Sequence, residues 1–301
     1  MRNIIHILKL VIPIALLLYI FRSQVRFHDV IQVMSNCNKK DFFIALSLFI
    51  ATKFQIALRL NLIASHYFRP GFRDILKDIF IANFFNTILP VGTGELYRIK
   101  GLADESKMIT RSAALIILDR MFGFTAILTT GFAAVCFGSN KIEIANKGII
   151  IFLTLTLMTL FLLIGSIIKK KKPGNRFIRE GQALFTFIHD YPFNAACLFV
   201  YSIMIILTLI YSIYFIGKGL GLTLVIWDYF CLYPVVLIAS LIPLSIGGLG
   251  IREFANIAVF GAIGVPKDQC VSLGLMQYLM MLIVASAGLM LLIVSRINKK
   301  T

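Results

Sequence analysis

Long apolar runs separated by short polar segments recur along the whole chain. Six of these runs reach about 20 residues, the length at which a helix crosses a hydrocarbon core of about 30 Å. No stretch between the runs is long and polar enough to form a soluble domain. The pattern predicts six transmembrane helices in a single transmembrane domain over residues 1–301. The predicted spans are 4–20, 42–62, 112–137, 148–168, 194–216 and 270–294.

Two further apolar segments, 80–98 and 227–264, contain residues that interrupt a helix. Proline lacks the N–H group of the helix ladder, and clustered glycines favour non-helical backbone. We therefore expect two broken or re-entrant helices within an all-α polytopic membrane fold. The motif residues are Asn86, Pro90, Gly92 and Gly94 in the first segment and Pro243, Gly247, Gly248 and Gly250 in the second.

The two broken segments resemble each other. Each continues from the glycine cluster to a glutamate and an arginine, and the two prolines lie about half the chain length apart. Three predicted spans separate the segments, so they would enter the membrane from opposite faces. This is the arrangement of an inverted repeat, with halves of about 1–168 and 180–301, in which discontinuous helices build a site near the midplane. The alternative is that the clusters mark loops between ordinary spans.

The composition agrees with a membrane location. The chain is 59% hydrophobic and 15% charged, against about 25% charged residues in soluble domains. Its net charge of +16 predicts basic loops that set topology and contact anionic lipid, and it does not predict a nucleic-acid site. The basic segment 169–179 predicts a cytoplasmic loop, with both termini on the cytoplasmic face of the cell inner membrane. A scaffold surface for partner enzymes is the alternative interpretation of this segment.

Several charged residues fall inside the apolar segments. Each costs roughly 2.5–3.5 kcal/mol near the bilayer centre, so each requires a partner or a function. We expect the Arg59 side chain to extend to the membrane interface. Lys53 is equally compatible with a structural role, in an internal pair or at the interface, and with a functional role. Arginines beside glycine-rich backbone suit an anion such as phosphate, and internal ion pairs that lock the bundle are the alternative. The remaining charged positions are Glu95, Arg98, Asp119, Arg120, Arg252 and Glu253.

The sequence contains no pattern typical of a metal, nucleotide or hydrolase site. The four histidines and five cysteines show no metal-ligand spacing, and neither a GxSxG nor a P-loop motif occurs. We therefore expect no metal, no cofactor and no enzymatic activity. The spacing of Gly217 and Gly221 permits close helix contact, and so permits a homo-oligomer.

Three elements of the chain resemble the lysylphosphatidylglycerol synthase transmembrane-region family of flippase-like membrane proteins. The first is N-x-x-L-P-x-x-x-G-E-x-x-R at 86–98, the second is Asp-Arg-x-x-Gly at 119–123, and the third is P-x-x-x-G-G-x-G-x-R-E at 243–253. The resemblance covers most of the chain. It implies two re-entrant helix pairs in inverted arrangement and movement of lipids between leaflets. It does not imply aminoacyl transfer, because the soluble synthase domain that follows in multiple peptide resistance factors is not in this sequence.

Together these features lead to the hypothesis of a lipid flippase of a bacterial inner membrane. The substrate would be an anionic lipid, with a polyprenyl-phosphate-linked sugar slightly favoured over a phospholipid or aminoacyl-phospholipid. The alternatives are a membrane-embedded lipid-linked sugar transferase, with Glu95 or Asp119 as the base, and an accessory scaffold. The expected headgroup-binding residues are Arg98, Arg252, Arg120 and Lys53, and the expected orienting or proton-coupling residues are Glu95, Asp119 and Glu253.

Overall fold

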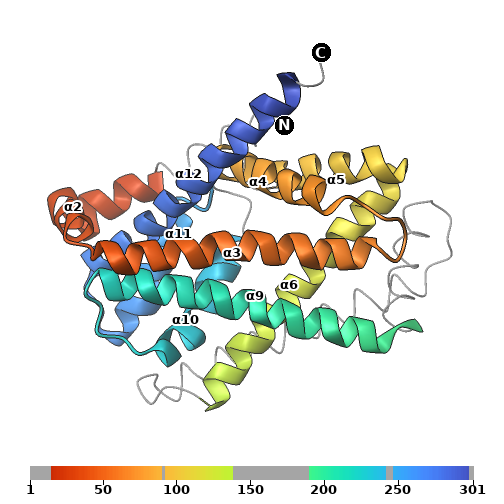
Figure 1. Cartoon of the computed structure of the whole chain (residues 1–301). Coiled ribbons are helices and arrows are strands. Elements are labelled where there is room, and N and C mark those ends of the chain that lie inside the picture. Colours follow the sequence, from red (N-terminus) through yellow and green to blue (C-terminus); the bar gives the residue numbers. More distant parts are fainter. Residues whose placement is uncertain (1–14, 90–91, 138–189, 242–246, 298–301) are drawn as a thin grey trace.

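The computed structural model describes residues 15–89, 92–137, 190–241 and 247–297 (Figure 1). Every regular element within these ranges is helical. The first-half elements are η1 Ile20–Gln24, α2 Phe27–Ser35, α3 Lys39–Ala64, α4 Phe72–Ile88, α5 Thr93–Ser106 and α6 Ile109–Phe137. The second-half elements are α9 Pro192–Gly219, α10 Ile226–Ser240, α11 Ile251–Phe260, η2 Gly261–Ile263 and α12 Lys267–Ile297.

Four of these helices, α3, α6, α9 and α12, are long and apolar enough to cross a membrane. They coincide with the predicted spans 42–62, 112–137, 194–216 and 270–294, which are confirmed as helices of spanning length. The predicted span 148–168, most of the predicted span 4–20 and the basic segment 169–179 lie outside the described residues.

The two predicted interruptions are present at the glycine clusters. α4 ends at Ile88 and α5 begins at Thr93, with Gly92 at a φ of 101° between them. α10 ends at Ser240 and α11 begins at Ile251, and the three glycines before α11 all have positive φ. Left-handed backbone is strained for residues with a Cβ atom, so glycine is required at these turns. The motif prolines, Pro90 and Pro243, lie outside the described residues.

The order of elements is the same in the two halves. A long helix, a broken pair and a second long helix occur as α3, α4–α5, α6 and again as α9, α10–α11, α12. The contacts between the halves are reciprocal, because α4 packs on α12 and α10 packs on α6. α3 and α9 run side by side through the middle of the molecule (Figure 1). The order of the elements and these two contacts are therefore alike in the two halves, while the inverted repeat stays a prediction.

The two broken segments meet where the halves touch. A Cβ atom on Gly247 would lie 2.9 Å from the carbonyl oxygen of Thr87, at the end of α4. The Tyr278 hydroxyl of α12 donates a hydrogen bond to the same carbonyl at 3.3 Å. Because only glycine permits this approach, the second break is held against the last turn before the first break.

The main apolar core lies among α3, α6, α9, α10, α11 and α12, around fully buried side chains such as Tyr229, Tyr233 and Phe260. Gly217 belongs to this core, since a Cβ atom there would lie 1.8 Å from the Tyr229 hydroxyl. Gly221 lies beyond the end of α9 at a φ of 81°. The Gly217–Gly221 spacing therefore serves packing and a turn within one chain.

Candidate functional site

A buried network of charged side chains joins α3, α5 and α6. Its centre is Asp119, whose side chain is 1% exposed. The Nε of Arg59 donates to Oδ1 of Asp119 at 2.8 Å, and the Nη2 of Arg98 donates to Oδ2 at 3.0 Å. Arg59 also donates to the hydroxyl of Ser202 on α9 at 3.0 Å. Asp119 thus bridges two buried arginines that come from different helices.

Glu95 extends this network towards α4. Its Oε2 accepts from the Nη1 of Arg98 at 3.0 Å, and its Oε1 accepts from Arg120 and, at 3.3 Å, from Asn86. The side chain of Arg120 is 53% exposed, unlike the nearly buried guanidinium of Arg98. Arg120 is therefore the network arginine that a ligand can reach most easily.

The first break sets the position of Glu95. Asn86 Oδ1 accepts the backbone N–H of Gly94 at 2.9 Å and so satisfies one of the free donors at the start of α5. A Cβ atom on Gly94 would lie 2.3 Å from the carbonyl oxygen of Ala82, so the two helices approach with backbone in contact. The motif residues Asn86 and Gly94 therefore anchor the helix turn that carries Glu95 and Arg98.

A cavity of about 630 Å³ lies beside the network. Charged groups line one part of it, namely Lys53, Arg59, Glu95 and Arg120. The rest of its wall is mostly isoleucine, leucine, phenylalanine and methionine side chains of α3, α5, α6, α9 and α10. The Lys53 ammonium lies 4.1 Å from the ring centroid of Phe49. No carboxylate of the described residues forms an ion pair with Lys53.

The cavity has a surplus of positive charge. The network and Lys53 together hold four cations, Lys53, Arg59, Arg98 and Arg120, and two carboxylates, Glu95 and Asp119. With all six groups ionised, the sum is two positive charges. An uncompensated charge in an apolar environment is costly, and a cation–π contact recovers only about 0.5–2 kcal/mol of that cost. The site is therefore suited to an anion.

The structure corrects the expectation for Arg59 and places the other expected site residues in two separate groups. Arg59 does not extend to the interface, because Asp119, 60 residues away in the chain, holds it in the interior. Four of the expected charged residues, Lys53, Glu95, Asp119 and Arg120, meet with Arg98 at the cavity or directly behind it.

Arg252 and Glu253 belong to a second, separate polar cluster. The Nη2 of Arg252 donates to the carbonyl oxygen of Gly247 at 2.9 Å and contacts the sulfur of Met281 at 3.4 Å. Glu253 accepts the backbone N–H of Gly250 and thereby caps α11. Neither residue lines the cavity beside Lys53.

Sequence reasoning missed three polar residues that complete these clusters. Ser202 accepts a hydrogen bond from Arg59. The amide of Asn256 is buried on α11, one turn after Glu253, and the amide of Gln277 is buried on the facing α12. A single uncharged polar residue in an apolar run gives a weak signal, because such residues are often satisfied within their own helix. Asn256 could have been found from the sequence, because it lies one helical turn after Glu253 and so shares its helix face.

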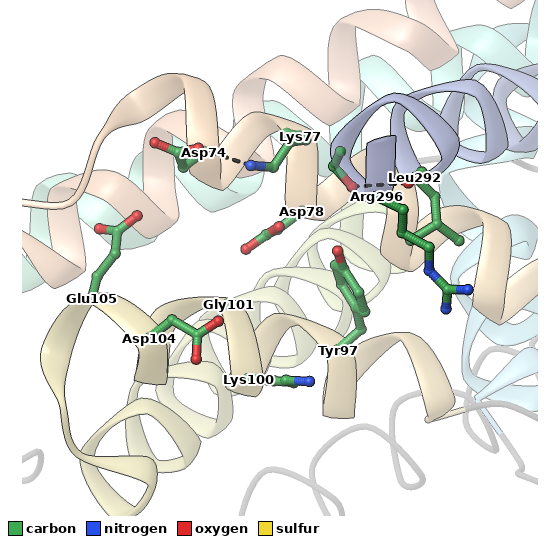
Figure 2. Close-up of a pocket in the computed structure, with 11 residues that line it drawn as sticks. Asp74, Lys77, Asp78, Tyr97, Lys100, Gly101, Asp104, Glu105, Leu292 and Arg296 are labelled. Carbon is green, nitrogen blue, oxygen red and sulfur yellow. Dashed lines mark hydrogen bonds and ion pairs between the residues drawn. The ribbon is translucent and has the colours of Figure 1, made fainter. Parts of the chain in front are cut away.

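A second cavity, of about 490 Å³, opens between α4, α5 and the end of α12 (Figure 2). Its lining includes four carboxylates and three cations, and Lys77 pairs with Asp74 at 2.9 Å. The carboxylates slightly outnumber the cations, so this cavity does not share the preference for an anion. Burial raises the pKa of Asp78, on α4 outside the four candidate spans, to about 7. The charged lining residues are Asp74, Lys77, Asp78, Lys100, Asp104, Glu105 and Arg296.

Comparison with known proteins identifies a family for this chain. The family model described as "Lysylphosphatidylglycerol synthase TM region" matches residues 6–288, nearly the whole sequence. No curated protein matches the chain. The match and the four apolar helices of spanning length together identify an integral membrane protein, and the match is consistent with a flippase-like role in lipid movement.

Proposed function

The chain belongs to the lysylphosphatidylglycerol synthase transmembrane-region family, and on this premise we propose that it moves an anionic lipid between membrane leaflets. The observation that carries the proposal is the surplus of two positive charges beside an apolar cavity of about 630 Å³. A lipid combines the two properties that such a cavity complements, an anionic headgroup and an apolar chain. A soluble anion complements only the first.

The charged residues have different roles in this proposal. Lys53 and Arg120 contact the headgroup, because both line the cavity and neither is held by the buried Asp119. Arg59 and Arg98 are both paired with the buried Asp119 and hold the network in shape. Glu95 orients Arg120 while the site is empty and releases it when a phosphate competes for the guanidinium.

The charge surplus also bears on the substrate. Phosphodiester headgroups carry one negative charge, whereas a lipid diphosphate carries about two and neutralises the site fully. A polyprenyl-phosphate-linked sugar carrier, above all one linked through a diphosphate, is therefore the substrate proposed here. An anionic phospholipid or aminoacyl-phospholipid is the alternative. The proposal includes an inverted arrangement of the two halves in a bacterial inner membrane with cytoplasmic termini, supported by the repeated motifs and the basic segment 169–179.

The transferase alternative has less support. It needs a carboxylate free to accept a proton, and Asp119 accepts hydrogen bonds from two arginines while Glu95 is bound by Arg98 and Arg120. Arginine partners favour the ionised carboxylate and weaken it as a base. Turnover of a lipid-linked sugar by the purified protein would contradict this argument.

The test is lipid movement in proteoliposomes. Three fluorescent lipids are compared: a zwitterionic phospholipid, an anionic phospholipid and a polyprenyl-diphosphate-linked sugar. Each is measured with the wild type, Lys53→Met and Arg120→Gln. Lys100→Met is the matched control, because Lys100 lies on α5 in the second cavity and not beside the network. We expect faster movement of the anionic lipids, and a loss of about ten- to a hundredfold in both cavity variants, since a hydrogen bond to a charged group is worth about 1.5–3 kcal/mol.

Thermal stability separates binding from structure. Lys53→Met removes a cation that has no ion pair and replaces it with an apolar side chain of similar length, so the unfolding temperature should stay equal or rise. A fall in both stability and transport would mean that Lys53 is structural. Equal movement of zwitterionic and anionic lipids would remove the charge argument altogether.

A further inference from the structure

Beside the second break, the described residues include buried polar atoms that have no hydrogen-bond partner. Five of them lie on α11 and the facing α12, and they belong to four side chains that are at least nine-tenths buried. Native interiors rarely leave such atoms unsatisfied, and ordered water or an ion is the usual explanation where they occur. The atoms are Nη1 of Arg252, Oε1 of Glu253, Nδ2 and Oδ1 of Asn256, and Oε1 of Gln277.

Glu253 stands out among the buried carboxyl groups. Its side chain is fully buried, its Oε2 caps Gly250, and its Oε1 faces α12 where a Cβ atom on Gly274 would lie 2.8 Å away. No ion pair joins it to a cation within the described ranges. Asp119 and Glu95, in contrast, are each bound by two arginines and are stable as anions.

A buried carboxylate without a paired cation is costly, and taking up a proton removes that cost. We propose that Glu253 is a proton-binding site through which lipid movement is coupled to a proton gradient. The inference rests on the proposed function, and it assigns the coupling role to one of the three carboxyls that the sequence left open. The proton passes from water on one side to Glu253, and from Glu253 to water on the other.

The surroundings of Glu253 allow a change of protonation to matter. Arg252 is the neighbouring cation on the same helix, and its Nη1 is unpartnered. From α12, Tyr278 faces the carboxyl, and Cys270 lies one turn before Gly274 with its thiol directed to the Val265 carbonyl. From α10, the Tyr233 hydroxyl is engaged by Gln277. Within the part of the chain that the structure describes, Arg252 is therefore the cation that an ionised Glu253 can attract.

Attraction of Arg252 would be transmitted to the first break. The Nη2 of Arg252 holds the Gly247 carbonyl at 2.9 Å, and Gly247 is packed against the Thr87 carbonyl. Thr87 is in the last turn of α4, next to Asn86, which positions Gly94 and Glu95. Loss of the proton thus pulls on the backbone of one break, and the contact between the breaks carries the change to the headgroup site.

The experiment imposes pH gradients of either sign across proteoliposomes and follows both the fluorescent anionic lipid and an entrapped pH dye. In the wild type, we expect the lipid rate to change up to about tenfold per pH unit, as one titrating proton predicts, with proton flux accompanying lipid. Glu253→Gln should still equilibrate lipid without a gradient but lose both responses. Glu253→Asp should keep them in part, and Glu105→Gln, an exposed change of the same kind, should keep them fully.

The outcomes separate this inference from the proposed function. Lipid movement that ignores pH gradients, or follows a sodium gradient instead, overturns the proton site and leaves the flippase standing. Infrared spectroscopy reports the protonation of Glu253 directly and does not depend on transport activity. Because Asp78 also has a pKa of about 7, the spectra are compared in an Asp78→Asn background. There, the carbonyl stretch of a protonated carboxyl at neutral pH should be weaker in Glu253→Gln than in the protein that keeps Glu253. Identical spectra would show Glu253 ionised and would overturn the inference even if no lipid moves.

Discussion

Replacing Asp119 with asparagine tests whether one carboxylate holds α3, α5 and α6 together. The change keeps the size and shape of the side chain and removes its charge. Arg59 and Arg98, with side chains 6% and 4% exposed, each lose their ionic bond to it. Arg98 keeps Glu95, whereas Arg59 keeps only the neutral hydroxyl of Ser202.

The expected loss of stability is large. Removing one partner of a buried ion pair costs about 3–5 kcal/mol, because the other charge stays buried and uncompensated. Folded domains are stable by only about 5–15 kcal/mol. At about 2–4 °C per kcal/mol for a chain of this size class, the unfolding temperature should fall by roughly 6–20 °C.

The assay is thermal unfolding of the purified protein in detergent, followed by loss of the monodisperse peak on size-exclusion chromatography. Asp104→Asn is the control, since Asp104 is exposed on α5, and it should shift the midpoint very little. The double variant Asp119→Asn with Arg59→Met should lose less stability than the sum of the losses of the two single variants, because the two residues interact. An Asp119→Asn protein with the same unfolding temperature as the wild type would refute the bridging role.

Three further predictions follow from single contacts. The pKa of Asp78 is about 7 in the folded protein and 3.8 in the unfolded chain, so the stability of the wild type should fall as the pH rises from about 4 to 7. Asp78→Asn should abolish this loss, so the variant should unfold at a higher temperature than the wild type at pH 8 but not at pH 4. Gly94→Ala should lower stability and transport together, because its Cβ would lie 2.3 Å from the Ala82 carbonyl, whereas Gly261→Ala, with open space around it, should do neither in the same two assays. Arg252→Ala should leave lipid binding in equilibrium assays unchanged but reduce the response to pH, since Arg252 does not line the cavity.

The helices and their breaks could be predicted because both depend on local chemistry. A run of about 20 apolar residues gives a spanning helix almost regardless of context, and glycine at positive φ interrupts the helical backbone, as at Gly92 and Gly250 directly before α5 and α11. The grouping of Glu95 with Arg98 was also local, because residues three apart share a helix face. These parts of the fold required no knowledge of the neighbouring helices.

The partners across helices could not be predicted in the same way. Arg59 pairs with Asp119 and Ser202, at separations of 60 and 143 residues, and nothing near Arg59 in the sequence distinguishes this from a side chain that extends to the interface. The equal motifs of the two breaks predicted equal roles for Arg98 and Arg252. Their neighbours differ, however, since Arg98 meets two carboxylates and Arg252 meets a backbone carbonyl and a methionine.

The ion pair between Arg59 and Asp119 has a consequence for biogenesis. α3 leaves the ribosome with Lys53 and Arg59 before α6 is made, and each cation costs about 2.5–3.5 kcal/mol at the centre of a helix that inserts alone. The 18-residue apolar windows of α3 and α6 have mean hydropathies of 1.6 and 1.5, against 2.3 and 2.4 for those of α9 and α12. The two least apolar of these four described spans are thus the two that the Arg59–Asp119 ion pair joins. We therefore expect stable insertion of α3 to depend on its being retained at the translocon until α6 arrives, so that the first half integrates as a unit and not helix by helix.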